Sequence, residues 1–197
     1  TLKIKLKNSS GLKSRYKFLG QIIIGILTLL ILIKYSDHQY LYNLYFPFFK
    51  NLIWHMGIFF IPFGLFVIIG ASNAVNLTDG LDGLATVPVM LVALSFTLIS
   101  YVVGNTIFSE YLQIQYIPDS GELSIFCGSV VGACLGFLWY NAPPAKIFMG
   151  DTGSLSLGGS LAAIAIIVKH EIVLAIIGGL FVLETVSVII QVASFKL

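Results

Sequence analysis

The sequence predicts an all-α fold: a polytopic membrane helix bundle with six transmembrane helices and both ends of the chain in the cytoplasm. Hydrophobic residues make up 57% of the 197 residues and charged residues 10%, and the mean hydropathy is +0.96. Soluble domains carry about 25% charged residues. Six of the basic residues fall within the first 17 positions, so too few charges remain to cover a water-exposed surface. A soluble domain is therefore excluded, and residues 1–197 are expected to form a single integral-membrane domain.

A transmembrane helix needs about 20 mostly apolar residues. The chain contains six such runs, of which the fifth is short and rich in glycine. Cys127 and Cys134, seven positions apart in one run, are expected to be buried packing residues without a disulfide between them. We expect the six helices at Phe18–Ile33, Leu52–Ala71, Leu84–Val103, Leu123–Tyr140, Ser154–Val168 and Ile172–Ala193.

The distribution of basic residues predicts the orientation. With six spans both chain ends share one side, and that side carries eight of the 11 Lys and Arg residues. Because cytoplasmic loops are enriched in Lys and Arg, we place the chain ends and the polar segments 76–83 and 141–151 in the cytoplasm. The aromatic-rich segment 35–50 then lies at the opposite interface. The net charge of +2 reflects the basic N-terminal segment, and no nucleic-acid partner is expected.

The first polar segment has Asn73, Asn76, Asp79 and Asp82 at every third position. A helical turn would bring these side chains to one side. Capping of the following helix by Asp79 explains one carboxylate only. Two carboxylates and two amides beside an apolar helix favour a functional polar site, because a charge inside the membrane costs about 2–3 kcal/mol.

The second polar segment begins at Asn141, passes through two prolines and reaches Gly150-Asp-Thr-Gly-Ser at the start of the fifth helix. Backbone N–H groups at a helix start bind phosphate. Asp151 would repel a phosphate there unless a cation lies between them, and Mg²⁺ takes one or two carboxylates together with water and phosphate oxygens. The alternative is simple helix capping by Asp151 or Thr152.

Together, Asp79, Asp82 and Asp151 have the chemistry for Mg²⁺-assisted handling of a phosphorylated substrate at the membrane surface. Composition and spacing do not name the substrate, and they leave transfer and transport both open.

Both polar segments resemble the signatures of the bacterial phospho-N-acetylmuramoyl-pentapeptide transferases, which belong to the polyprenyl-phosphate N-acetylhexosamine-1-phosphate transferase superfamily. The matching segments are Asn76-Leu-Thr-Asp-Gly-Leu-Asp-Gly-Leu-Ala85 and Asn141-Ala-Pro-Pro-Ala-Lys-Ile-Phe-Met-Gly-Asp-Thr-Gly-Ser-Leu155, with further similarity at 8–12 and 183–196. The resemblance implies a Mg²⁺-dependent enzyme of peptidoglycan synthesis in the bacterial inner membrane. It would transfer phospho-MurNAc-pentapeptide from UDP-MurNAc-pentapeptide to undecaprenyl phosphate, giving lipid I and UMP. The implied partners are these two substrates and the lipid bilayer, with a homodimer left open.

The resemblance also implies roles for individual residues. Asp151 would be catalytic and would bind Mg²⁺, and Lys3 would be a second catalytic residue that holds a phosphate. The implied substrate-binding residues are Asn76, Asp79 and Asp82 for the nucleoside and diphosphate, and Asn141 and Phe148 for the uracil, with Phe148 stacking on it.

Parts of the family's pattern fall outside these residues. The family carries an Asp-Asp-x-x-Lys motif, and Thr1-Leu2-Lys3 resembles its last three residues. It also carries a His-rich cytoplasmic loop beyond the last helix seen here. We therefore expect the chain to be an internal fragment of the enzyme and to be inactive alone.

Two other functions remain open. A GlcNAc-1-phosphate transferase of the same superfamily would use UDP-GlcNAc as donor, although the run from Asn141 to Ala145 favours the MurNAc enzymes. A membrane transporter is the alternative from another class. Transporters place their carboxylates near the bilayer midplane, often in repeated halves, whereas here the carboxylates gather at one face.

Overall fold

The computed structural model describes residues 14–36 and 38–196, and these are almost entirely helical. In this part of the chain five helical segments are long and apolar enough to span a membrane, and a bent pair of shorter helices forms a sixth. The prediction of an all-α polytopic membrane bundle is confirmed. The five continuous segments are α2 (Ser14–Tyr35), α4 (Phe60–Thr78, preceded by the short helix η1, Gly57–Phe59), α5 (Thr86–Val103), α7 (Leu123–Asn141) and α8 (Gly150–Ile167).

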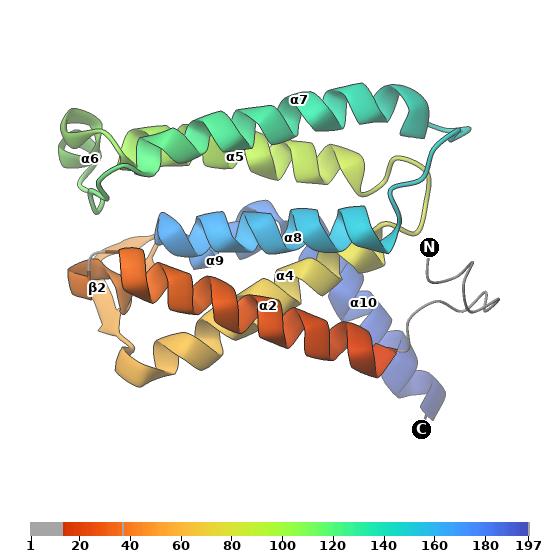
Figure 1. Ribbon diagram of the computed structural model, residues 1–197, viewed down its shortest axis with the longest axis horizontal. Helices are drawn as coiled ribbons and strands as arrows, with labels where there is room; N and C mark the ends of the chain where they lie inside the picture. Colours follow the sequence, from red (N-terminus) through yellow and green to blue (C-terminus); the bar gives the residue numbers. More distant parts are fainter. Residues whose placement is uncertain (1–13, 37, 197) are drawn as a thin grey trace.

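The helices run roughly along one axis (Figure 1). Helices α5 and α7 pack against each other, α4 packs against α8, and α2 lies on α4. The α4–α5 and α7–α8 connections lie at one end of the bundle, together with the start of α2. We call this the Asp151 end. The opposite end, which carries a β-hairpin, is the hairpin end.

The hairpin end contains the small elements of the fold. They are α3 (His38–Leu41), the antiparallel strands β1 (Asn43–Phe46) and β2 (Phe49–His55), α6 (Thr106–Leu112) and the short helix η2 (Ser120–Glu122). The predicted boundaries of the second span, Leu52–Ala71, are therefore wrong at both ends. Its first residues pair with β1, and α4 continues to Thr78. Hydropathy could not separate the apolar residues 52–54 of the strand from the apolar helix that follows.

The sixth span is broken. A continuous helix over Ile172–Ala193 was expected, but α9 (Glu171–Ile177) and α10 (Gly179–Lys196) meet at an angle of 78°. Gly178 permits the break, because a Cβ there would lie 2.8 Å from the Leu174 carbonyl oxygen. Helix α10 consequently leaves the bundle at the Asp151 end (Figure 1).

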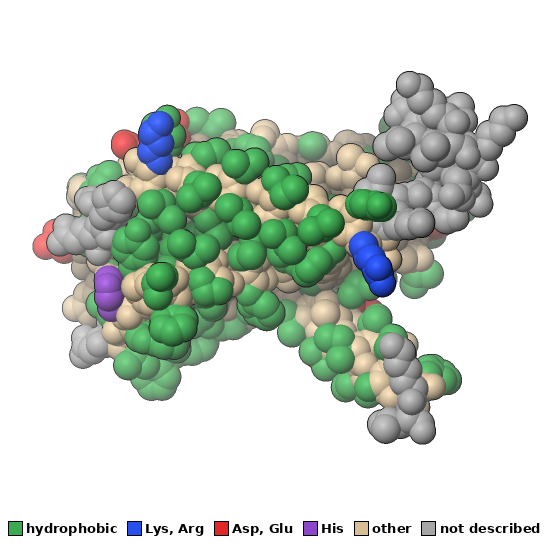
Figure 2. Space-filling view, turned by 60° about the horizontal axis from the view of Figure 1, so that its bottom comes forward, with side chains coloured by type: hydrophobic (Ala, Val, Ile, Leu, Met, Phe, Trp, Pro, Cys, Tyr) green, Lys and Arg blue, Asp and Glu red, His purple; other side chains and the backbone are tan. Residues whose placement is uncertain are grey.

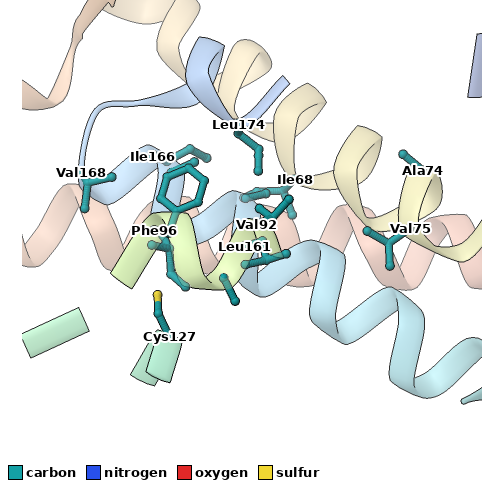
Figure 3. Packing of buried hydrophobic residues seen from close by; sticks show 14 of the residues in the cluster. Ile68, Ala74, Val75, Val92, Phe96, Cys127, Leu161, Ile166, Val168 and Leu174 are labelled. Atoms are coloured by element: carbon teal, nitrogen blue, oxygen red, sulfur yellow. The ribbon is translucent and has the colours of Figure 1, made fainter. Parts of the chain in front are cut away.

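The core lies between α4, α5, α7 and α8 (Figure 3). Phe96 of α5 is fully buried and lies near Ile166 of α8 and Cys127 of α7. Cys127 and Cys134 are buried and free, as expected. Hydrophobic side chains also cover most of the outer face seen in Figure 2, which is the surface that a lipid environment requires.

The contact between α4 and α8 is very close. A Cβ on Gly158 would lie 2.5 Å from the backbone oxygen of Ala71 and 2.8 Å from the Cα of Ser72. The hydrophobic effect does not drive helices together within lipid. Membrane helices associate through van der Waals packing, which small residues improve because they let the backbones approach closely. This contact fixes the end of α4 beside the start of α8, where the predicted functional residues lie.

Candidate functional site

A polar cluster joins three helices at the Asp151 end. It contains Lys17 from the first turn of α2, Asn76 from the last turn of α4, and Asp151 and Ser154 from the start of α8. Lys17 Nζ donates to Asn76 Oδ1 at 2.9 Å and to Asp151 Oδ2 at 3.1 Å. Asn76 and Asp151, both predicted as site residues, are thus in direct contact although they lie 75 positions apart in the sequence.

Asn76 is the centre of this cluster. Its Nδ2 donates to Asp151 Oδ1 at 3.1 Å and to the Ser154 hydroxyl at 2.9 Å, while its Oδ1 accepts from Lys17. Ser154 is fully buried, and its hydroxyl donates a hydrogen bond to the Gly150 carbonyl. Because one amide bonds to both the cation and the carboxylate, the Asp151 side chain is oriented while most of it stays exposed to solvent.

Asp79 lies next to this cluster, at the residue where α4 ends. It accepts a hydrogen bond from the Gly150 N–H. Partial burial raises the pKa of the Asp79 carboxyl above its ordinary value, the Gly150 bond lowers it, and the negative charge of Asp151 raises it. Asp151 is exposed and Asp79 is partly buried, and two carboxylates that repel each other form a place where a cation is favourable.

Simple helix capping does not explain these carboxylates. Helix α8 begins at Gly150, in the segment expected to open the fifth helix and four residues before the expected span Ser154–Val168, and its N-cap Met149 makes no side-chain capping bond. The N-cap of α5 is Ala85, again without a side-chain bond, so Asp79 does not cap that helix. Asp82 Oδ2 instead accepts from the Ala145 N–H at 3.0 Å and thereby ties the two polar segments together.

Asn141 and Phe148 occupy very different environments. Asn141 is 3% exposed, accepts from the Thr86 hydroxyl at 2.7 Å and donates to the Ile147 carbonyl at 2.9 Å. Phe148 is 70% exposed at the surface of the second polar segment. An aromatic ring left open in this way offers a stacking face, whereas the Asn141 amide is committed to contacts within the protein.

The remaining predicted residue, Lys3, lies outside the described residues. Lys17 was missed as a site residue because it was counted with the N-terminal basic run. The one usable signal was its position directly before the apolar run at Phe18, which places it on the first turn of a membrane helix.

The residues at the Asp151 end fit a hard cation held partly by water. Among the described residues no group of three His, Cys, Asp or Glu side chains lies close enough to enclose a metal ion. Mg²⁺ does not need such a cage, since it keeps several water ligands and uses one or two carboxylates together with substrate phosphates. Asp151, supported by Asp79, supplies that donor set, and Lys17 is the cation that holds the Asp151 carboxylate in the structure.

Two apolar grooves lie between the helices of the bundle. One of about 560 Å³ lies between α2, α4 and α8, and Lys17, Gln21 and Thr152 are among its lining residues. The other, of about 320 Å³, lies between α4, α8, α9 and α10. The first groove reaches the polar cluster at Lys17, whereas the second is lined by none of the cluster's residues.

The fold and the site together define a multi-pass membrane protein with a cluster of charged and polar side chains at one end of its helix bundle. Residues 8–169 match the model of glycosyl transferase family 4. Since this match covers most of the chain, the chain belongs to that family.

Curated relatives agree with this family. The chain is 70% identical over 195 residues, 99% of its length, to a protein of Pelagibacter ubique named phospho-N-acetylmuramoyl-pentapeptide-transferase. Proteins with the same name from Rickettsia prowazekii and Rhodopseudomonas palustris are 59% and 58% identical over 98% of this chain. In each case the chain spans about half the length of the relative, 54%.

Proposed function

We propose that this chain forms the substrate-holding core of a phospho-N-acetylmuramoyl-pentapeptide transferase. The reaction joins phospho-MurNAc-pentapeptide from UDP-MurNAc-pentapeptide to undecaprenyl phosphate and releases UMP and lipid I. The observation that carries the proposal is the cluster of Lys17, Asn76 and Asp151 beside apolar membrane grooves. The name shared by the curated relatives supports the choice of substrates.

The chemistry requires positive charge at a membrane surface. An oxygen of the lipid phosphate attacks the sugar-linked phosphorus of the donor, and the bond from that phosphorus to the UMP oxygen breaks. Negative charge therefore gathers on phosphate oxygens, which preorganised cations stabilise. Lys17 Nζ supplies one fixed positive charge, and Asn76 orients it through the bond to its Oδ1. Mg²⁺ bound at Asp151 would neutralise diphosphate oxygens.

The two substrates differ in polarity, and the surroundings of the cluster suit both. The isoprenoid chain of the acceptor needs an apolar groove in the membrane, such as those along α4 and α8. The donor needs an opening to water, where Asp151 and Phe148 are exposed. We assign the uracil to the open face of Phe148, the nucleoside and diphosphate to Asn76, Asp79 and Asp82, and a second phosphate contact to Lys3.

Donor specificity is the direct test. The protein, expressed from its full reading frame in membranes, should form lipid I with UDP-MurNAc-pentapeptide and Mg²⁺, and should release one UMP for each lipid I. Turnover with UDP-GlcNAc but not with UDP-MurNAc-pentapeptide would assign the chain to the GlcNAc-1-phosphate enzymes instead. Uptake of substrate into proteoliposomes without any covalent product would indicate a transporter.

Localisation is tested separately. We place the protein in the bacterial inner membrane with the Asp151 end facing the cytoplasm, because most basic residues belong to that side. Single cysteines replacing Phe148 and Phe48 report the two ends, since both residues are exposed and the native thiols are buried. In spheroplasts, an impermeant maleimide should label the cysteine at position 48 and should reach position 148 only after lysis. The reverse pattern would refute the orientation.

A further inference from the structure

A buried hydrogen-bond chain connects α5 to the exposed Phe148. The Thr86 hydroxyl donates to Asn141 Oδ1 at 2.7 Å, and Asn141 Nδ2 donates to the Ile147 carbonyl at 2.9 Å. Thr86 is 1% exposed and Asn141 is 3% exposed, so water does not compete for the bond between these two side chains. Ile147 directly precedes Phe148, and the chain of bonds therefore ends at the backbone that carries the aromatic ring.

The segment between Asn141 and Phe148 is folded back on the end of α7 by further bonds. Lys146 N–H donates to the Tyr140 carbonyl at 2.8 Å, and Ala145 N–H donates to Asp82. The Ile147 N–H also donates to the Tyr140 carbonyl, at 3.3 Å. These bonds hold the segment through its N–H groups, whereas the Asn141 amide holds the Ile147 carbonyl, directly before Phe148. Asn141 can do so only in one orientation of its amide, with Oδ1 toward α5.

Thr86 determines that orientation. Its hydroxyl proton goes to Asn141 Oδ1, which leaves Nδ2 facing the Ile147 carbonyl. Without the hydroxyl, Oδ1 would be a buried acceptor with its donor removed, which is unfavourable. The Asn141 side chain would then gain by rotating toward other donors and would release Ile147.

We propose that Thr86 is a positioning residue for nucleotide binding, acting through Asn141 on the backbone that presents Phe148. This rests on the proposed function, in which Phe148 stacks on the uracil of the donor. In this scheme Asn141 supports the base from behind, because its buried amide serves the protein instead of the ligand. Thr86 touches neither substrate, and its effect falls on donor affinity.

The test compares three variants. Thr86→Val removes the hydroxyl with little change of volume, and Thr86→Ser keeps it. Thr97→Val is the matched control, because Thr97 lies on the same helix and its hydroxyl bonds only within the helix, to the Ala93 carbonyl at 2.9 Å. The readouts are hydrogen exchange of the amides of residues 142–149, the dissociation constant of UMP, and the KM and kcat of transfer in protein expressed from the full reading frame.

For Thr86→Val we expect roughly tenfold faster exchange at Lys146 and Ile147, and a roughly tenfold higher UMP dissociation constant and donor KM. We expect kcat to stay within about twofold, since the phosphate cluster is not touched. Thr86→Ser should restore all values, and Thr97→Val should change none.

Each other outcome counts against the proposal. Unchanged exchange in Thr86→Val would refute the link from Thr86 to the segment. Faster exchange with unchanged UMP affinity would refute its role in nucleotide binding. If the wild-type protein binds UMP but transfers nothing from either donor, the proposed transferase function fails, while the exchange and UMP measurements still decide the role of Thr86.

Discussion

Lys17 Nζ lies 3.1 Å from Asp151 Oδ2, although 134 residues separate them in the sequence. The two side chains come from the first turns of α2 and α8, and Asn76 of α4 bonds to both. Three helices that only partly contact one another are thus joined by one polar cluster at their common end. The cluster is the only element of the described structure in which a lysine, an amide and a carboxylate bond to one another.

Replacing Lys17 tests whether its contact with Asp151 serves transfer activity or the stability of the fold. The Asp151 carboxylate is 71% exposed, and such ion pairs contribute about 0–1 kcal/mol to stability. Lys17→Met should therefore shift the unfolding midpoint in detergent only slightly. It should lower transfer about 100-fold or more, because a charge aimed at the reacting phosphates is lost. Arg15→Met, which removes an exposed cation two residues earlier, should leave transfer unchanged. A large loss of stability in Lys17→Met would show that the contact is mainly structural.

Asp151→Asn tests the metal site. The amide keeps the size of the side chain but removes the negative charge that a hard cation requires. We expect Mg²⁺-dependent transfer to fall to background and calorimetric Mg²⁺ binding to weaken at least tenfold. Asp119→Asn, at the exposed hairpin end, is the control and should alter neither. Near-normal transfer by Asp151→Asn would remove this residue from the metal-binding role.

The sequence predicted a helix or strand well where its own hydropathy determines it, and poorly where contacts with other segments do. Apolar runs predicted α5 and α7 to within two residues, because lipid forces such runs into helices whatever surrounds them. Leu52 was misplaced because Leu52, Ile53 and Trp54 are apolar and lie close before the apolar helix, although they belong to the strand β2. The break at Gly178 also escaped prediction, since a glycine in a membrane helix is compatible with both a straight and a bent path.

The candidate site divides in the same way. Asn76, Asp79 and Asp151 were predicted correctly to lie at one end of the bundle, because their spacing at helix ends is a local property. Lys17 was missed, since its contacts depend on how α2 lies on α4. The burial of Asn141 was not predicted either, because nothing in the sequence marks Thr86 of an apolar helix as its hydrogen-bond partner.

The pKa of Asp79 predicts a pH dependence. Burial, and secondarily the charge of Asp151, raise the pKa of the folded state above that of the unfolded chain. The folded protein thus binds the proton more tightly, so this carboxyl favours folding at low pH, and the benefit is lost as pH rises through the raised pKa. Asp79→Asn should therefore gain stability relative to wild type at neutral pH and lose that advantage below about pH 4. Unfolding midpoints at a series of pH values measure this difference, and a wild-type advantage at neutral pH would contradict it.

Gly158→Ala tests whether the close contact of α4 with α8 supports the site. The added methyl group would meet the backbone of Ala71 and Ser72, which cannot rotate away. The two helices must move apart, at a cost of about 1–3 kcal/mol. Gly159→Ala is the matched control, since a Cβ there meets nothing within 4 Å and alanine favours a helix.

The functional readout makes this pair of variants decisive. Asn76 lies at the end of α4, and its bonds to Asp151 and Ser154 of α8 need both helices in register. Gly158→Ala should therefore lower the unfolding midpoint and weaken Mg²⁺ binding together, whereas Gly159→Ala should keep Mg²⁺ binding and hold or raise the midpoint. If Gly158→Ala were destabilised but bound Mg²⁺ normally, the cluster would not depend on the spacing of α4 and α8. Mg²⁺ binding would then be set by Asp151 and its water ligands alone.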